Sequence, residues 1–158
     1  KLYSTDAVFV RIHMNLLTLS WSKILSAAPY TSSGKYLYDA FAYDSPLEKD
    51  NITTDIEEVV VYGKIPRSSI AIPTITGSMY SPDFMYVVKK ASGEKELNIV
   101  IETKDVEGKD VLRGTEAAKI ECARVFFEIL SKEGYTVHFR DQINNKQMAQ
   151  IINEVLQM

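Results

Sequence analysis

SPDFMYVVKK (residues 81–90) and LNIVIETK (residues 97–104) are two runs rich in β-branched and aromatic side chains, separated by only six residues. Runs of this composition are typical of β-strands. The intervening ASGEKE contains Gly93 and is typical of a turn. We therefore expect the two runs to pair as an antiparallel hairpin, and the rest of the domain to be arranged around it.

The first of these strands begins with an acid, Asp83, directly after Pro82. Because side chains alternate along a strand, Glu102 and Lys104 at the end of the second strand point to one face. Antiparallel pairing places the start of one strand beside the end of the other, which brings Asp83 next to them. The residues alone leave two interpretations open: a strand start beside a surface salt bridge, or half of a metal site.

The metal interpretation depends on the chemistry of these side chains. Two carboxylates supply the oxygen ligands that Mg²⁺ prefers, and the ion usually keeps several waters. A bound Mg²⁺ acidifies such a water and stabilises charge on a phosphate under attack. A nearby lysine can orient the water or neutralise the developing charge. The pattern therefore predicts phosphoryl chemistry as the alternative to a surface ion pair.

The segments around the hairpin predict an α/β domain. Ser45 fits a helix N-cap, with Pro46 at the first helical position and Glu48 three residues after the cap. Gly134 is typical of a helix C-terminus. In chain order we expect a helix at 5–28 ended by Pro29, a strand or extended arm at 35–43, a helix from 46 to about 58, strands at 59–65 and 68–74, the hairpin, a helix at 111–134, a strand at 135–141 and a helix at 144–157. This order predicts a mixed β-sheet flanked by helices.

The long helix at 111–134 has a predicted apolar face with helical spacing. Its members are Ala118, Cys122, Val125, Phe126 and Ile129. We interpret Cys122, the single cysteine, as a core residue rather than a reactive thiol. One cysteine allows no internal disulfide, and with two histidines it argues against a structural zinc site. A reducing compartment, the cytoplasm, fits this composition best.

Length and composition indicate one compact globular domain, with 158 residues of which 46% are hydrophobic and 25% charged. The apolar stretch at 8–28 is interrupted by polar and charged residues, so it is not a membrane span. The chain starts at Lys1, which we interpret as a fragment of a longer protein. Its net charge is −3, whereas a stand-alone nucleic-acid binder is more often basic. A DNA-acting domain of this charge must therefore take affinity from a local patch or from another domain.

SPDF (81–84) and IETK (101–104) resemble the PD-(D/E)xK nuclease signature. The wider sequence is more specific and resembles the C-terminal endonuclease domain of the restriction (Res) subunit of type III restriction–modification systems. The similarity covers roughly residues 36–140. We assign residues 36–158 to the endonuclease domain and residues 1–35 to an N-terminal helical extension. The segments that carry the resemblance are SPLEKDNI (45–52), VVVYGKIPRSSIAIPT (59–74), SPDFMYVV (81–88), IVIETKD (99–105) and GTEAAKIECARVFFEIL (114–130).

The resemblance implies a restriction-endonuclease-like core and a Mg²⁺-dependent endonuclease that cuts double-stranded DNA. It implies that Asp83 and Glu102 ligate the metal with the Thr103 backbone carbonyl, and that Lys104 assists the nucleophile. In such systems a superfamily 2 helicase-type ATPase motor precedes the nuclease, and a separate modification (methyltransferase) subunit recognises the DNA sequence. The pattern G-x-x-x-x-G-K-[ST] does not occur here, so ATP would act only through a helicase domain outside this chain.

Further residues are candidates for contacts with the metal or with DNA. Glu48 lies where many superfamily members place an acid that points toward the metal, although an N3 capping glutamate is the simpler interpretation. Glu116 and Lys119 share a helix face. They form either a solvated ion pair or, for Lys119, a contact with a DNA phosphate or the active-site acids. Lys64 and Arg67 flank the predicted strands at 59–74 and are weaker candidates for the DNA backbone.

Two alternatives to this function stay open. One is a non-catalytic DNA-binding or assembly module on the same fold, which docks a motor or a modification subunit. Asp83, Glu102 and Lys104 argue against it, because a retired site has no chemical need for all three. The other is a different PD-(D/E)xK nuclease, such as a DNA-repair or junction enzyme.

Overall fold

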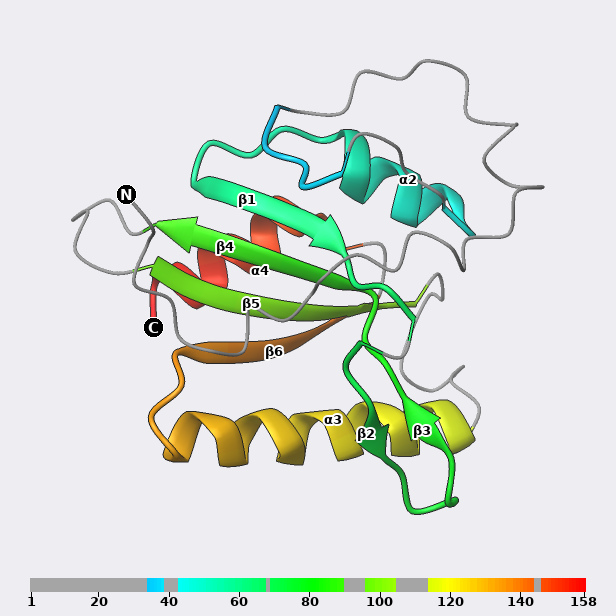
Figure 1. Cartoon of the computed structure of the whole chain (residues 1–158). Coiled ribbons are helices and arrows are strands. Elements are labelled where there is room, and N and C mark those ends of the chain that lie inside the picture. The colour runs from blue at the N-terminus through cyan, green and yellow to red at the C-terminus, as the bar shows by residue number, and fades with distance from the viewer. Residues whose placement is uncertain (1–33, 39–42, 68, 90–95, 105–113, 144–145) are drawn as a thin grey trace.

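A computed structural model describes residues 34–38, 43–67, 69–89, 96–104, 114–143 and 146–158. Its centre is a four-stranded sheet in the order β1-β4-β5-β6 (Figure 1). β4 (Phe84–Lys89) runs antiparallel to both of its neighbours, β1 (Val59–Lys64) and β5 (Glu96–Thr103), and β6 (Val137–Gln142) joins β5 in parallel. This mixed sheet confirms the predicted fold class.

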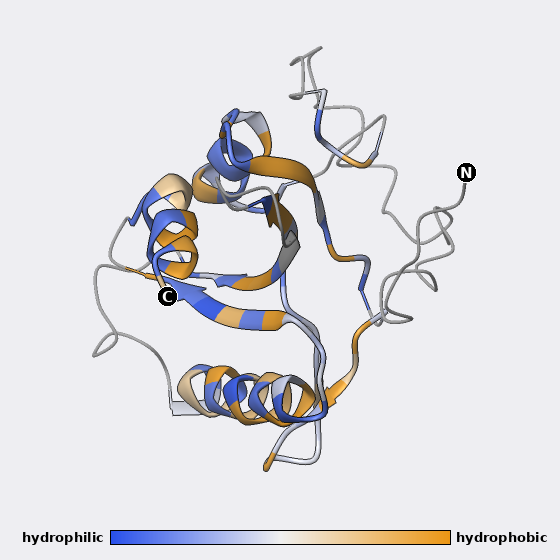
Figure 2. Cartoon of the chain, turned by 90° about the vertical axis from the view of Figure 1, so that its left-hand side faces the viewer, coloured by the Kyte–Doolittle hydropathy of each residue, from blue (hydrophilic) through white to orange (hydrophobic). Residues whose placement is uncertain are grey.

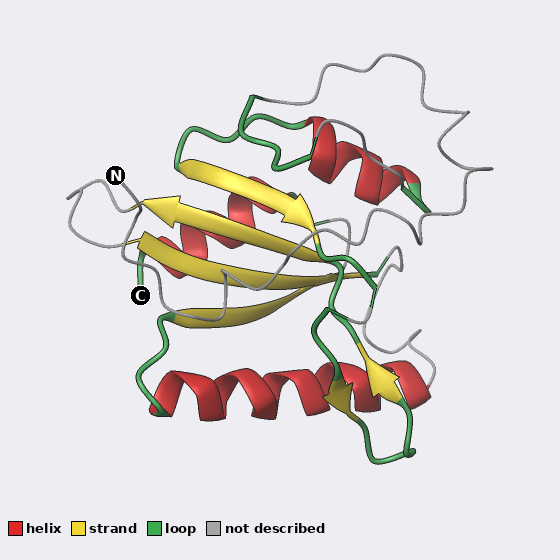
Figure 3. Ribbon diagram, in the orientation of Figure 1, coloured by secondary structure: helices red, strands yellow, loops and turns green. Residues whose placement is uncertain are grey.

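Helices cover both faces of the sheet (Figure 3). α2 (Pro46–Thr53) and α4 (Met148–Leu156) contribute to the hydrophobic core of one face. α3 (Gly114–Lys132) contributes to the core of the other face. A small second sheet of β2 (Ile72–Pro73) and β3 (Met79–Tyr80) lies beside α3. Among the described residues, no helix is long and apolar enough to cross a membrane.

β4 and β5 form the antiparallel hairpin that the sequence predicts, with Phe84 paired to Ile101. Side chains of β5 alternate between the two cores, since Ile101 packs with α2 and α4 and Val100 packs with α3. β4 is buried at five consecutive positions, because both of its faces are covered. The hairpin is thus held in the middle of the sheet, and its acids lie at one end of it.

The helix predicted from residue 46, α2, is shorter than its sequence pattern indicates. It was expected to reach about residue 58, but it ends at Thr53. Thr54 is already extended, and Ile56 enters the core beyond the helix. β-branched threonines favour helices weakly, so core burial of Ile56 decides where the helix stops.

The strand predicted at 68–74 is reduced to Ile72–Pro73 and lies outside the main sheet. Proline has no N–H for a ladder, which prevents a longer central strand. The chain then turns at Gly77, whose φ of +79° favours glycine, and returns as β3. The result is the small β2–β3 hairpin, which the sequence did not predict.

α3 presents a different face to the core than predicted. Val125 and Ile129 are 48% and 54% exposed, although their spacing indicated core positions. Figure 2 shows hydrophobic and hydrophilic residues interleaved along this helix, so spacing alone does not select one face. The ring of Phe127 stacks on Phe139 of β6 with 5.6 Å between centroids, and this contact decides the rotation. The buried residues are Ile120, Ala123 and Phe127.

The other predictions for this part of the chain agree better with the structure. Cys122 is half-buried and packs against the α3-side core, as expected for a core residue. Gly134 follows α3 with a φ of +96°, as expected for a helix-ending glycine. The segment predicted as a strand or an arm is an arm where it is described, because Tyr36 makes only a single bridge, to Tyr62 of β1. The helix predicted at 5–28 lies outside the described residues.

Candidate active site

Asp83 stands directly before β4, opposite the end of β5. Its carboxylate accepts a hydrogen bond of 2.8 Å from the backbone N–H of Thr103. Its own N–H donates to the carbonyl of Ile101 at 3.2 Å. Continued by one position, the strand register sets Asp83 across from Glu102, where facing Cβ atoms are about 4.5–5.5 Å apart. The structure thus brings together the two acids that hairpin geometry predicted to be neighbours.

Glu102 is held at both of its carboxylate oxygens. The Nζ atom of Lys104 lies 2.8 Å from Oε1, which confirms that the acid and the lysine share a face. The hydroxyl of Tyr80 donates a hydrogen bond to Oε2. The Glu102 side chain is only 3% exposed, whereas that of Lys104 is 26% exposed. The site therefore has a buried acid at its base and opens to solvent on the lysine side.

The ionisation of Asp83 depends on its surroundings. Burial, followed by the negative charge of Glu102, raises the pKa of Asp83 to about 7. Burial lowers the pKa of Lys104, but the hydrogen bond and charge of Glu102, with Asp83 and Glu116, raise it overall. Lys104 therefore stays charged. The ionised form of Asp83 would be stabilised by any additional positive charge nearby. A divalent cation between the acids would supply that charge.

Glu116 reaches the same lysine from the first turn of α3. Its Oε1 lies 3.8 Å from Lys104 Nζ. Among the described residues, no ion pair joins it to Lys119, so that part of the prediction is wrong. Glu102 and Glu116 contact this ammonium group, and Asp83 is a third acid whose charge acts on it. With all four groups ionised, the cluster has a formal charge of −2. A contact of Lys119 with DNA stays a prediction.

Glu48 is buried on α2 at the edge of this cluster. The N–H of Glu48 donates to Ser45 Oγ, which confirms Ser45 as the N-cap. The Glu48 carboxylate accepts from the Asp44 N–H at 2.9 Å and pairs with Lys64 Nζ at 2.5 Å, rather than closing a capping box. Its charge also contributes to the raised pKa of Asp83. Glu48 is thus near the site but paired, and its role toward a metal stays a prediction.

Lys64 and Arg67 differ as candidates for DNA contact. Lys64 is half-buried and bound to Glu48, so it is already committed within the domain. Arg67 is 90% exposed and lies 3.7 Å from Asp44. Exposed ion pairs of this kind contribute little and exchange readily for other partners. Arg67 therefore remains the better candidate for a DNA phosphate.

A buried polar network supports the site from the opposite face of β5. The side-chain amides of Asn51 and Gln142 bond to each other in both directions, at 2.6 and 3.0 Å. The Thr103 hydroxyl donates to the same Gln142 oxygen at 3.2 Å. The backbone N–H of Thr103 donates to Asp83, so the network fixes the position of the donor that holds this carboxylate. Sequence analysis missed these amides, because nothing in the sequence pairs residues 91 positions apart.

Replacing Gln142 by alanine is expected to destabilise the domain by about 3 kcal/mol. The change leaves the buried amide of Asn51 with only a 3.4 Å hydrogen bond to the Thr103 hydroxyl and removes the acceptor of that hydroxyl. Buried polar groups that lose a partner cost about 1–3 kcal/mol each. Thermal unfolding of the 158-residue chain measures the effect. The control is Gln157→Ala at the exposed end of α4, which is expected to stay within about 0.5 kcal/mol of the wild type. Equal stability of the two variants would contradict the network.

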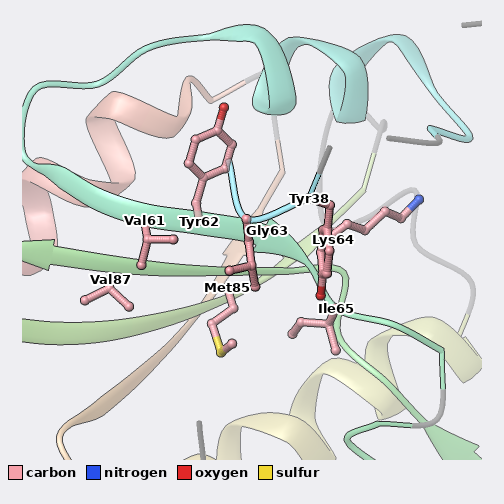
Figure 4. Close-up of a pocket in the computed structure, with 9 residues that line it drawn as sticks. Tyr38, Val61, Tyr62, Gly63, Lys64, Ile65, Met85 and Val87 are labelled. Carbon is pink, nitrogen blue, oxygen red and sulfur yellow. The ribbon is translucent and has the colours of Figure 1, made fainter. Parts of the chain in front are cut away.

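A cavity of about 220 Å³ over the outer strand β1 is not the chemical site (Figure 4). Its lining includes Val61, Met85 and Val87 and none of the site's acids. Gly63 also lines the cavity. A Cβ atom added at Gly63 would lie 3.1 Å from the ring of Tyr38, so the position favours glycine. Its lining contains one cation, Lys64, which is paired with Glu48, and no carboxylate that could bind a metal. We therefore place the chemistry at the end of the β4–β5 hairpin.

The residues at that end fit a hard cation. Asp83 and Glu102 offer carboxylate oxygens, and none of their described contacts is with sulfur or imidazole. Among the described residues, no three His, Cys, Asp or Glu side chains form a preassembled metal cage. Mg²⁺ does not need one, since it is often bound by one or two carboxylates and a substrate phosphate. The Thr103 carbonyl as a further ligand stays a prediction.

Known proteins with similar sequences cover most of this chain. Residues 34–146 match the profile of a family described as an endonuclease domain. The chain is 48% identical over 122 residues to the type III restriction-modification enzyme EcoP15I Res subunit of Escherichia coli and to the EcoPI Res subunit of Escherichia phage P1. It is 26% identical over 120 residues to the StyLTI Res subunit of Salmonella typhimurium. The matches cover 77%, 77% and 76% of this chain, but it spans only 12%, 12% and 11% of these relatives. No solved structure matches significantly.

Proposed function

Because this chain belongs to the endonuclease-domain family of type III restriction Res subunits, we propose that it hydrolyses phosphodiester bonds of double-stranded DNA with the help of Mg²⁺. The observation that carries the proposal is the convergence of Asp83, Glu102 and Lys104 at one end of the β4–β5 hairpin. Two acids and a lysine in this arrangement suit metal-assisted attack of water on a phosphate.

Each of the three side chains has a role that follows from its surroundings. Asp83 and Glu102 would hold the cation. When bound, Mg²⁺ supplies Lewis-acid stabilisation of the phosphate and acidifies water. Lys104 stays protonated beside Glu102 and is the most exposed of the contacting pair, so its ammonium can face the phosphate or orient the attacking water. The Thr103 N–H keeps the Asp83 carboxylate turned toward β5.

The sign of the local charge favours catalysis over simple DNA binding. The cluster of Asp83, Glu102, Glu116 and Lys104 has a formal charge of −2, which repels a DNA phosphate. A module that only bound DNA would need a positive surface at this position. A bound divalent cation would neutralise the negative charge of the cluster and would itself attract the phosphate. This supports an endonuclease rather than the non-catalytic module.

The remaining components of the reaction are proposed to lie outside this chain. We propose that ATP acts through a helicase-type motor, that a modification subunit recognises the DNA, and that DNA affinity comes largely from these parts. Cleavage of both strands needs two such sites, so we propose that two copies of the system meet, through this domain or through other parts. We place this activity in the cytoplasm, where a free thiol such as Cys122 is compatible with the reducing environment.

Replacing Glu102 by glutamine is expected to slow DNA cleavage about 100-fold without affecting ATP hydrolysis. Glutamine keeps the size of the side chain and one oxygen for Lys104, and the Tyr80 hydroxyl can accept from its amide. The variant therefore loses mainly the charge that would hold the metal. The measurement uses the Res polypeptide that contains this domain, assembled with its modification subunit, with DNA, ATP and Mg²⁺.

Glu121→Gln is the matched control, because Glu121 is exposed on α3 and pairs only weakly with Arg124. It should cleave at the wild-type rate. Wild-type cleavage by Glu102→Gln would show that the acid is not a ligand, and the proposed site would be wrong.

A further inference from the structure

Tyr80 is the one residue of the β2–β3 hairpin that touches the proposed catalytic acids through a described contact. It lies at the end of β3, and its side chain is buried in the core beneath α3. Its hydroxyl donates to Oε2 of Glu102, 22 positions away in the chain. A phenol is a neutral hydrogen-bond donor at neutral pH, so Tyr80 can hold the carboxylate without adding a charge.

The small hairpin that carries Tyr80 is built to hold it in place. Ile72 pairs with Tyr80 across the two strands, and both side chains are buried in the α3-side core. The turn is closed by Thr74, whose N–H and hydroxyl both donate to the Ser78 carbonyl at 2.9 Å. Gly77 adopts the left-handed conformation within this turn. The hairpin thus presents a fixed phenol to the acid, although its strands have only two residues each.

A neutral donor on the second oxygen of Glu102 has a specific chemical effect. It orients the carboxylate without adding a positive charge that would repel a cation, unlike the Lys104 ammonium on the first oxygen. Hydrogen bonds to ligating carboxylates orient the ligands of metal sites, and their loss typically costs about 10–100-fold in metal affinity or activity. An acid that is only 3% exposed depends on such partners more than an exposed one does.

We propose that Tyr80 is a positioning residue that holds the Glu102 carboxylate ready for a divalent cation, and that the β2–β3 hairpin exists in this domain to deliver it. The inference rests on the proposed function, because it assumes that Glu102 is a metal ligand. It adds a residue outside the nuclease signature on which the metal affinity of the site depends.

The test is calorimetric titration of the 158-residue chain with Mn²⁺, used as the probe for the divalent-cation site. Tyr80→Phe removes only the hydroxyl, and the dissociation constant is expected to rise about 10-fold. Tyr62→Phe is the matched control. Tyr62 is also buried, and its hydroxyl also donates one hydrogen bond, but to the backbone carbonyl of Ile52. The affinity of Tyr62→Phe for Mn²⁺ is expected to equal that of the wild type.

The outcomes separate this inference from the proposed function. If Tyr80→Phe binds Mn²⁺ as the wild type does while Asp83→Ala has lost binding, the metal site stands and the role of Tyr80 is refuted. If the wild-type chain and Asp83→Ala bind Mn²⁺ equally, or neither binds it, the proposed metal site fails and this inference fails with it. A 10-fold loss in both Tyr80→Phe and Tyr62→Phe would indicate a general effect on the fold and would also overturn it.

A second measurement keeps the inference testable if Tyr80→Phe does not fold. Wild-type chain labelled with ¹³C at the tyrosine Cζ atoms is titrated with Mg²⁺. The resonance of the phenol that is hydrogen-bonded to Glu102 is expected to shift on metal binding. The resonance of Tyr62, assigned because it is missing from the spectrum of Tyr62→Phe, is expected not to shift. Tyrosine resonances that all ignore Mg²⁺, while calorimetry detects its binding, would overturn the inference.

Discussion

Lys104→Ala is expected to reduce DNA cleavage about 1000-fold while leaving ATP hydrolysis intact. The change removes the ammonium that lies 2.8 Å from Glu102 and can face the phosphate. Loss of one preorganised electrostatic group of this kind typically costs 10²–10³ in rate, or about 3–4 kcal/mol of transition-state stabilisation. Because Lys104 is not a metal ligand, Mn²⁺ binding to the chain should persist or become tighter. The rate is measured with the assembled restriction system, DNA, ATP and Mg²⁺.

Lys119→Ala is the matched control for this prediction. Lys119 is also a half-exposed lysine, three residues after Glu116 on α3, but it has no ion pair with Glu116 among the described residues. A phosphate contact by Lys119 would weaken DNA binding modestly, so we expect less than about a tenfold effect. Equal effects of the two substitutions would show that Lys104 contributes charge to DNA binding and has no special role in the reaction.

Asp83→Asn is also expected to reduce cleavage about 1000-fold, although the two side chains have nearly the same shape. The Thr103 N–H needs an oxygen acceptor at this position. Asparagine has one such oxygen, and using it turns the NH₂ group toward the place of the cation. The site then loses a ligand and gains a repulsive dipole, which together cost several kcal/mol of transition-state stabilisation. Cleavage at the wild-type rate would remove Asp83 from the proposed site.

The same substitution is expected to stabilise the metal-free chain at high pH. The folded pKa of Asp83 is about 7, above its ordinary value of 3.8. Between these values the folded protein keeps a proton that the unfolded chain has released. Stability therefore falls as the pH rises through this window, and the loss is complete somewhat above pH 7. Asparagine cannot ionise, so Asp83→Asn should be more stable by about 2 kcal/mol at pH 8.5, with allowance for the partial exposure of Asp83.

Thermal unfolding with a chelator present, at pH 8.5 and pH 5, measures this difference. The gain from Asp83→Asn should shrink toward zero as the pH falls toward 4. Asp50→Asn, at an exposed aspartate of α2, is the control and should not be more stable than the wild type at pH 8.5. If Asp83→Asn were less stable than the wild type at pH 8.5, the claim that ionised Asp83 destabilises the folded chain would be wrong. Opposite effects on cleavage and stability are what a strained functional site should show.

The sequence predicts those parts of the site that depend on local geometry. Alternation along β5 places Glu102 and Lys104 on one face, and the short turn restricts β4 and β5 to an antiparallel pairing. Asp83 then has to lie near them, because strand rise and register leave it no other place. The N-cap at Ser45 was predictable for the same reason, since its hydrogen bond spans only three residues.

Predictions that depended on contacts between distant segments were less successful. The spacing of apolar residues on α3 fits more than one face, and only the stacking of Phe127 on Phe139 decides which face is buried. The partner of Glu116 is Lys104, from another element, rather than Lys119 on the same helix. Local spacing limits which contacts are possible, but it does not choose among them when several are nearly equal in energy.

By itself, the sequence determined the hairpin, the two acids and the lysine at its end, and the family to which the chain belongs. Short-range backbone geometry requires these residues to meet, whatever surrounds them. Only the tertiary structure decided what holds them: the Tyr80 hydroxyl on Glu102, and the Asn51–Gln142 pair behind Thr103. These contacts join residues 22 to 91 positions apart. They form because buried polar groups must find partners once the sheet and its helices have packed, and no local pattern records that need.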